Sequence, residues 1–158
     1  MLRLNMIEYA KTFLGNFYRW GGDDPSGFDC SGFAIECLRS VGLVDEDQDL
    51  TAHGLLMKFS DKKVLVLTYQ TFPSILPDNA SEPGNLIFAL DEQQRANHVE
   101  IILNKLQTIG ASGGNSTTTT LEKAIKQNAF IKIRPVSKFK NKHHIIIVDP
   151  FLGQQTHN

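Results

Sequence analysis

The stretch FDCSGFAIECLRSVGL, from Phe28 to Leu43, constrains the fold more than any other part of the chain. Its apolar residues recur at i, i+3, i+4, i+7, i+8 and i+11, the spacing of one face of an α-helix that closes at Gly42. The stripe consists of Cys30, Phe33, Ala34, Cys37, Leu38 and Val41. The spacing therefore predicts a helix that begins at Cys30 and packs one apolar face against the rest of the molecule.

The two cysteines of the chain differ in their position on this helix. Cys30 stands at its start, where unpaired backbone N–H groups and the positive end of the helix dipole favour a thiolate. Cys37 lies two turns further, where apolar neighbours raise the pKa of a thiol, so we expect it in the core. Periodicity alone leaves core filling open for both. Seven residues at a rise of about 1.5 Å separate them by about 10 Å, beyond the limit of about 7 Å for a disulfide, and two free thiols suit a reducing compartment of synthesis.

The remaining pattern places helices first and strands afterwards. Capping pairs and apolar spacing predict helices over residues 6–14 (Asn5 with Glu8), 51–59 and 119–126 (Thr119 with Glu122). Residues 62–83 contain three prolines and are expected to be irregular or edge-like. Five short strands are expected at NLIFAL, HVEIIL, QTIGAS, FIKIRP and HHIIIV, and the alternating Lys138, Lys140 and Lys142 indicate a solvated edge strand.

This order predicts an α+β domain in which the cysteine helix packs on an antiparallel sheet of about five strands. At 158 residues, with 41% hydrophobic and 21% charged residues, the chain is expected to form a single domain, 1–158, with a core over about 5–150 and a C-terminal tail at 151–158.

Charge and hydropathy narrow the function classes. A formal net charge of -1 offers no field for gripping a polyanion, so nucleic acid is not expected as a partner. No apolar run reaches the roughly 20 residues that cross a bilayer, and the N-terminus has no uninterrupted apolar stretch, so we expect synthesis in the cytoplasm without a signal peptide and no membrane insertion. His143 and His144 are neighbours on one strand and face opposite sides, and the loop Asp45–Asp49 lacks the glycine and final acid of a calcium loop, so no metal is expected.

A nucleophilic thiol needs a base, and His98 is the best candidate. It opens the strand HVEIIL, whose apolar residues suit packing against the cysteine helix. A cysteine at a helix start after a glycine-rich turn, followed later by a strand histidine, is typical of cysteine nucleophiles, although a lone strand histidine is more often structural.

These residues carry a family resemblance. YRWGGDDPSGFDCSGF from Tyr18, PGNLIF from Pro83 and HVEIIL from His98 resemble the NlpC-type papain-like cysteine peptidases that cut bacterial cell-wall peptides, over roughly residues 5–115. The resemblance implies Cys30 as nucleophile and His98 as base, with no cofactor. It also implies a substrate site lined by Tyr18, Trp20, Asp29 and Ser31, although the aromatics could be core residues and Asp29 only a helix cap.

The chain departs from the family pattern at two positions. The family usually has a polar residue, often His, twelve positions after the base, where this chain has Gly110, and a small residue two after the base, where it has Glu100. If the hairpin turns near Lys105, these two are cross-strand partners, and Glu100 shares a face with His98. We therefore expect Glu100 as the third catalytic member, with Asn115, Ser112 and His144 as weaker candidates.

The expected function is hydrolysis of an amide in peptidoglycan stem peptides, commonly the bond between D-γ-glutamate and the diamino acid. The expected partner is bacterial peptidoglycan, reached from a phage or prophage through a tail, by lysis as an endolysin, or through a secretion apparatus. Two other functions stay open: an inactive wall-peptide-binding or phage-tail structural domain, and a papain-like amidase or acyltransferase on another substrate. A fast reaction of Cys30 with iodoacetamide would favour the enzyme.

Overall fold

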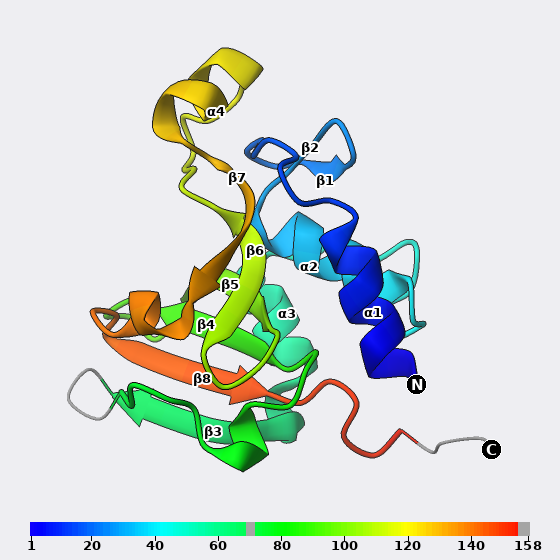
Figure 1. Cartoon of the computed structure of the whole chain (residues 1–158), viewed down its shortest axis with the longest axis vertical. Coiled ribbons are helices and arrows are strands. Elements are labelled where there is room, and N and C mark those ends of the chain that lie inside the picture. Colours follow the sequence, from blue (N-terminus) through cyan, green and yellow to red (C-terminus); the bar gives the residue numbers. More distant parts are fainter. Residues whose placement is uncertain (69–71, 155–158) are drawn as a thin grey trace.

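The computed structural model of the protein describes residues 1–68 and 72–154. Within them the fold is α+β: helices lead, and a six-stranded antiparallel sheet follows in the order β3-β8-β4-β5-β6-β7 (Figure 1). The helices are α1 (Leu2–Lys11), α2 (Cys30–Arg39), α3 (Ala52–Lys58) and α4 (Leu121–Gln127). The strands of the main sheet are β3 (Lys63–Thr68), β4 (Leu86–Leu90), β5 (Ala96–Ile102), β6 (Gln107–Ser112), β7 (Phe130–Pro135) and β8 (His144–Val148). A small hairpin, β1 (Asp23–Asp24) with β2 (Gly27–Phe28), precedes α2.

Two apolar cores cover the two faces of the sheet. The larger one joins α1, α2 and α3 to one face, where Val99 and Ile101 of β5 point toward the helices. The smaller one lies on the other face and is closed by the loop residue Leu76 and by two short 3-10 turns, η3 (Asp78–Ala80) and η4 (Val136–Phe139). No helix among the described residues combines the length and apolarity that would let it cross a bilayer.

Helix α2 forms where the spacing predicted it. Asp29 is its N-cap, and the carboxylate accepts the N–H of Gly32 at 2.8 Å, which satisfies one of the free donors of the first turn. The buried face contains Cys30, Phe33, Ala34, Cys37 and Leu38. Three residues beyond the last helical residue, Arg39, Gly42 adopts a positive φ of 72°, so the chain can turn back and bond Leu43 N–H to the Leu38 carbonyl.

The first helix begins earlier than the capping pair indicated. It starts at Leu2, its N-cap is Met1, and no side chain caps it, so the Asn5–Glu8 capping box is wrong. The first turn is instead fixed by Arg3, whose guanidinium reaches both carboxylate oxygens of Asp149 at 2.7 Å and lies 4.5 Å above the ring of Phe151. Long-range contacts of this kind do not show in a local sequence pattern.

The sheet has six strands where about five were expected. The additional strand, β3, lies in the proline-containing region 62–83 but ends before its prolines, and it pairs antiparallel with β8 at the edge of the sheet. Its apolar run of alternating Val and Leu pairs with residues about 80 positions later, so only the register reveals it as a strand.

The lysine-rich segment 138–142 is not an edge strand, which corrects that expectation. Lys138 lies in η4, and the chain then loops to β8. The strand order explains this, because the chain leaves β7 at one edge of the sheet and must pass β6, β5 and β4 to insert β8 beside β3.

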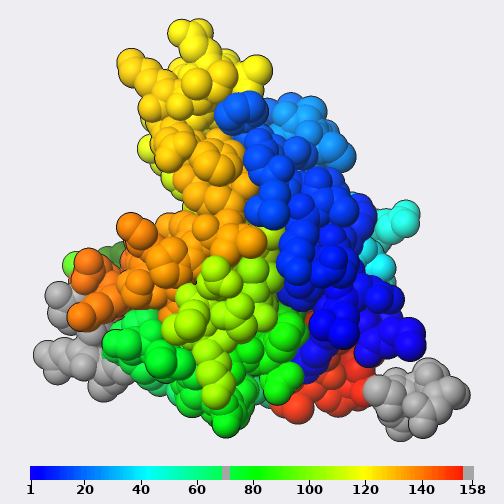
Figure 2. Space-filling model, viewed as in Figure 1, coloured from blue at the N-terminus to red at the C-terminus, as the bar shows by residue number. Residues whose placement is uncertain are grey.

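Between β6 and β7 the chain makes an excursion that carries α4. Its N-cap is Thr120, one residue after the expected Thr119, and it ends on Asn128 in the left-handed conformation. Figure 2 shows this excursion standing out from the body of the molecule beside the N-terminal segment. Backbone bonds join the two: Tyr18 N–H donates to Ala129, and Ile131 N–H donates to Asn16.

The expected C-terminal tail, 151–158, is packed at its start. Phe151 is buried in the larger core beneath Arg3. Residues 155–158 of that tail lie outside the described residues.

Candidate active site

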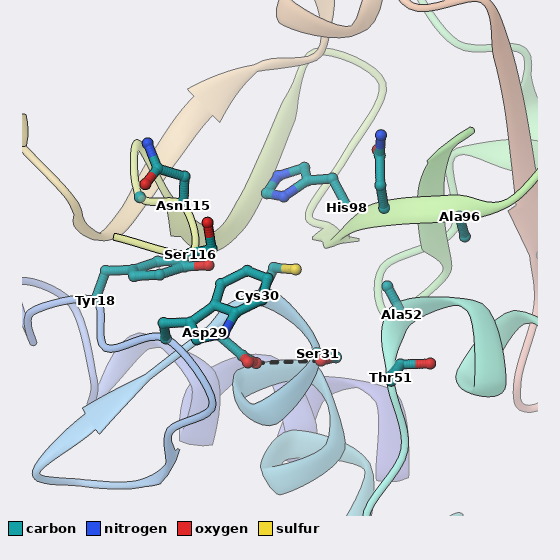
Figure 3. A pocket seen from close by; sticks show the side chains of 13 residues that line it. Tyr18, Asp29, Cys30, Ser31, Thr51, Ala52, Ala96, His98, Asn115 and Ser116 are labelled. Carbon is teal, nitrogen blue, oxygen red and sulfur yellow. Dashed lines mark hydrogen bonds between the residues drawn. The ribbon is translucent and has the colours of Figure 1, made fainter. Parts of the chain in front are cut away.

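A pocket of about 460 Å³ opens where the first turn of α2 meets the start of β5. Figure 3 shows Cys30 and His98 between two walls, with Tyr18, Asn115 and Ser116 on one side and Thr51, Ala52 and Ala96 on the other. The pocket thus contains both members of the expected pair, together with Tyr18, Trp20, Asp29 and Ser31. The structure brings all six of these sequence-predicted residues to one place.

Cys30 is the first residue of α2 and is 9% exposed, at the wall of the pocket. Its backbone N–H belongs to the first turn, whose amides have no partner within the helix. The helix therefore directs a partial positive charge to the thiol and offers an N–H donor beside it. Cys37 is fully buried, and burial raises the pKa of its thiol well above the ordinary value, so it is a core residue as expected.

His98 faces both Cys30 and Glu100. Burial lowers the pKa of His98, but hydrogen bonds to Cys30 and Glu100 and the negative charge of Glu100 outweigh it and raise the pKa to about 9. The Nε2 atom lies 2.9 Å from Glu100 Oε1. Because a carboxylate accepts, Nε2 donates to Glu100, and a pKa of about 9 means that Nδ1 also carries a proton near neutral pH.

Glu100 is 1% exposed and holds three partners. Besides His98, its Oε1 receives Arg134 Nη2 at 2.5 Å, and its Oε2 receives the Thr108 hydroxyl at 2.5 Å. Burial raises the pKa of Glu100, but the hydrogen bond and charge of His98 and the charge of Arg134 outweigh it, so the pKa is lowered and the group is ionised. A buried carboxylate with this many donors is fixed in position.

Gly110 provides the space that Glu100 occupies. β5 and β6 are joined by a turn at residues 103–106, and the register Ile101↔Ile109 places Glu100 opposite Gly110, which confirms the expected hairpin. A Cβ on Gly110 would lie 2.5 Å from Glu100 Cγ. The two departures from the family pattern are therefore one arrangement, in which a carboxylate fills the place that a side chain at 110 would take.

Tyr18 lies over the cysteine from the loop before β1. Its ring packs against Gly114, where any side chain would collide with it, and it is 4% exposed. Burial, together with the charges of Cys30 and Asp29, raises the pKa of its hydroxyl, which therefore keeps its proton as a hydrogen-bond donor.

The other expected substrate residues, Trp20, Asp29 and Ser31, also line the pocket. Trp20 is 53% exposed and borders a second, adjoining pocket of about 230 Å³. Asp29 accepts from the Ser31 hydroxyl at 3.1 Å and from Gly21 N–H at 3.0 Å, besides its bond to Gly32. Its oxygens thus hold the loop and the helix start together, so capping and pocket lining coexist in one residue.

The weaker candidates lie in three different places. Asn115 lines the pocket and accepts from Thr117, whereas Ser112 is buried and its hydroxyl has no hydrogen-bond partner in the part of the chain that is described. His144, the first residue of β8, is hydrogen-bonded to Gln94 and does not line the pocket. His53 accepts the N–H of Ala96 at 3.2 Å and so supports the start of β5.

Sequence reasoning missed Arg134 and Thr108, the other two partners of Glu100. They face each other across β6 and β7, in the register Thr108↔Arg134. The excursion with α4 separates the two strands in the sequence, so a local pattern does not show that they pair. Over residues 1–68 and 72–154, no group of three or more His, Cys, Asp or Glu side chains could hold a metal ion.

An α+β domain with a cysteine at the start of a helix and a histidine on an adjacent strand has the papain-like fold. The model of the NlpC/P60 family matches residues 15–135, and the chain belongs to this family. The solved NlpC/P60 domain of the peptidoglycan hydrolase SagA is 22% identical, with a TM-score of 0.58 over 93% of this chain and 97% of that one. The peptidoglycan hydrolase RipB from Mycobacterium tuberculosis is 19% identical, with a TM-score of 0.61 over 94% of this chain and 64% of that one. These likenesses show the fold.

Among curated proteins, the chain is similar to the probable endopeptidase p60 of Listeria grayi. The two are 32% identical over 79 residues, which is 50% of this chain and 12% of that protein. The chain thus spans a small part of the length of this relative.

Proposed function

We propose that the protein is a cysteine peptidase that hydrolyses an amide bond in peptidoglycan stem peptides. The observation that carries the proposal is the pair of Cys30 and His98 in an open pocket, with Glu100 bonded behind the imidazole. Family membership supports it, as do the similar proteins, which are described as a probable endopeptidase and as peptidoglycan hydrolases.

The proposed reaction uses the pair twice. In the proposed resting pair the thiol proton of Cys30 has already passed to Nδ1 of His98, and the sulfur attacks the carbonyl carbon to form a tetrahedral oxyanion. The N–H of Cys30 and the protonated hydroxyl of Tyr18 are the donors placed for that oxygen. The C–N bond then breaks, His98 protonates the leaving amine, and a thioester remains. Water attacks the thioester, with His98 as base, and releases the carboxylic acid and the free thiol.

Glu100 takes the orienting role in this scheme. It accepts from His98 Nε2, which fixes the tautomer and the plane of the ring, and its charge stabilises the imidazolium that forms after proton transfer. This placement favours an enzyme over an inactive binding domain, because the polar group absent at Gly110 is replaced by one from the neighbouring strand.

The finer proposals concern the substrate and its location. We place the amino-terminal side of the stem peptide near Asp29 and Ser31, and we propose the bond between D-γ-glutamate and the diamino acid as the one cleaved. Such a substrate puts the site of action in the bacterial cell wall. Delivery by a phage, by lysis or by a secretion apparatus stays a prediction.

The test is digestion of defined muropeptides, with the products read by mass. From a muropeptide the wild type should release the peptide that begins with the diamino acid and leave L-alanyl-D-glutamate on the muramic acid. Cys30→Ala should release nothing, and Cys37→Ala, which removes the buried thiol, should cleave like the wild type. Cleavage at another amide would correct the bond but keep the class.

Two other outcomes would overturn the proposal. Binding of muropeptides without cleavage by the wild type would favour the wall-binding domain. No binding, combined with rapid alkylation of Cys30 by iodoacetamide, would favour an amidase or acyltransferase on another substrate.

A further inference from the structure

Arg134 is a partly buried cation beside the candidate pair, and no step of the proposed reaction uses it. It projects from β7 and lies under η4, with its guanidinium carbon 5.7 Å from the centre of the Phe139 ring. Its side chain is 24% exposed, and its Nε is buried without a hydrogen-bond partner among the described residues. Its strong contact is therefore the one to Glu100, at 2.5 Å.

Arg134 and His98 compete for the same oxygen. Both donate to Glu100 Oε1, from Nη2 at 2.5 Å and from Nε2 at 2.9 Å. The two nitrogens lie 3.4 Å apart, and since a guanidinium can only donate, they do not bond each other while Nε2 carries its proton. Arg134 thus weakens the stabilisation of the imidazolium by Glu100 in two ways. It shares the negative charge of the same oxygen, and it places a positive charge beside the imidazolium.

The balance of these charges matters for an acid that must release its proton. A carboxylate alone in this buried place would hold the imidazolium strongly, and a tightly held proton passes poorly to a leaving amine. A carboxylate without a cation would also be costly to bury. The contact of Arg134 with Glu100 both weakens the hold of the carboxylate on the imidazolium and lowers the cost of burying the carboxylate.

We propose that Arg134 is a positioning residue that acts through Glu100, holding the carboxylate ionised and in place while limiting how strongly it stabilises the protonated form of His98. It thereby sets the upper end of the pH range in which His98 carries a proton. Only the hydrolysis readout below rests on the proposed function.

Within residues 1–68 and 72–154, few charged groups lie around His98. Its direct ionisable partners are Cys30 on α2, Glu100 on its own strand and Arg134 on β7, and Tyr18 lines the same pocket. On α3, which packs against β5, His53 accepts the N–H of Ala96. Lys132, two residues before Arg134, bonds the Asn128 carbonyl at 2.7 Å and lies over Phe130, so it is a matched cation on the same strand without a hydrogen bond to Glu100.

The experiment is an NMR titration of the His98 imidazole, assigned by its absence in His98→Gln. In Arg134→Gln, which keeps a donor but loses the charge, the midpoint should rise by about half to one pH unit, whereas in Glu100→Gln it should fall by about one unit or more. Arg134→Lys should restore the wild-type midpoint, and Lys132→Met, which removes a more distant cation, should move it much less than Arg134→Gln does.

The pH at which muropeptide hydrolysis declines on the alkaline side should be highest in Arg134→Gln, intermediate in the wild type and lowest in Glu100→Gln. An unchanged or lowered midpoint in a folded Arg134→Gln protein would overturn the inference. If Arg134→Gln does not fold, Arg134→Lys decides: a midpoint away from the wild-type value then contradicts it. Because the titration does not measure turnover, it tests the role of Arg134 independently of whether the protein is a peptidase.

Discussion

The space at Gly110 leads to a specific prediction for Gly110→Ala. The new methyl group would lie 2.5 Å from Glu100 Cγ and 3.1 Å from its Cβ and Cδ, where ordinary contact begins at 3.4 Å. The Cγ atom must therefore move by about 0.9 Å. That shift is large for a carboxylate held by three partners, and it would stretch the 2.9 Å bond to His98 beyond hydrogen-bonding distance.

The cost follows from that bond. A hydrogen bond to a charged group contributes about 1.5–3 kcal/mol, and about 1.4 kcal/mol corresponds to a factor of ten, so kcat/KM should fall by about 10- to 150-fold. Overpacking should also lower the free energy of unfolding by about 1–3 kcal/mol. The measurements are muropeptide hydrolysis and urea unfolding of the same samples.

A matched control and a rescue sharpen this test. Gly54→Ala adds a methyl group at ordinary distances of 3.5 Å or more inside α3, so it should leave activity intact and stabilise the fold by up to about 1 kcal/mol. The double variant Glu100→Gly with Gly110→His restores the usual family arrangement and should be at least about tenfold more active than Gly110→His alone. Wild-type activity in Gly110→Ala would refute the role given to the position of Glu100.

Two further predictions concern stability. The pKa of His98 is raised in the folded state to about 9 from an ordinary 6.5, so its contribution to stability is complete below about pH 6.5 and is lost as the pH rises through about 9. Over this range, urea unfolding should show that the free energy of unfolding falls by up to about 3 kcal/mol. The same fall in a His98→Gln variant would contradict the assignment. Arg3→Met removes the contacts to Asp149 and Phe151 and should cost about 2–3 kcal/mol in thermal or urea unfolding, against about 0.5 kcal/mol or less for Lys11→Met, which breaks an exposed pair; equal costs would refute the role of Arg3 as an anchor.

The features visible in the sequence are those set by short-range spacing. The stripe from Cys30 to Leu38 predicted both the helix and the burial of Cys37, because the 3.6-residue period is a local property. The opposition of Glu100 and Gly110 could also be predicted, because a short hairpin fixes the register of the residues on either side of its turn.

The features that the sequence did not reveal depend on distant partners. β3 becomes a strand through β8, and Arg3 replaces the expected capping box through Asp149. Arg134 looks like an ordinary exposed member of an alternating strand, yet the register across the α4 excursion turns it toward Glu100. Its contact with Glu100 depends on the pairing of three strands, β5, β6 and β7.

The place of β8 has a consequence for how the chain matures. Strand β8, the last one among the described residues, inserts between β3 and β4, which are made about 60 to 80 residues earlier. β3 therefore cannot join the sheet until residues 144–148 have emerged from the ribosome. Ile145 and Ile147 complete the smaller core, and Phe139, beside Arg134 and His98, belongs to that same core. Although Cys30 and His98 are synthesised before β8, the core around Phe139 is complete only after translation has passed β8, so nascent chains are expected to carry an incomplete site.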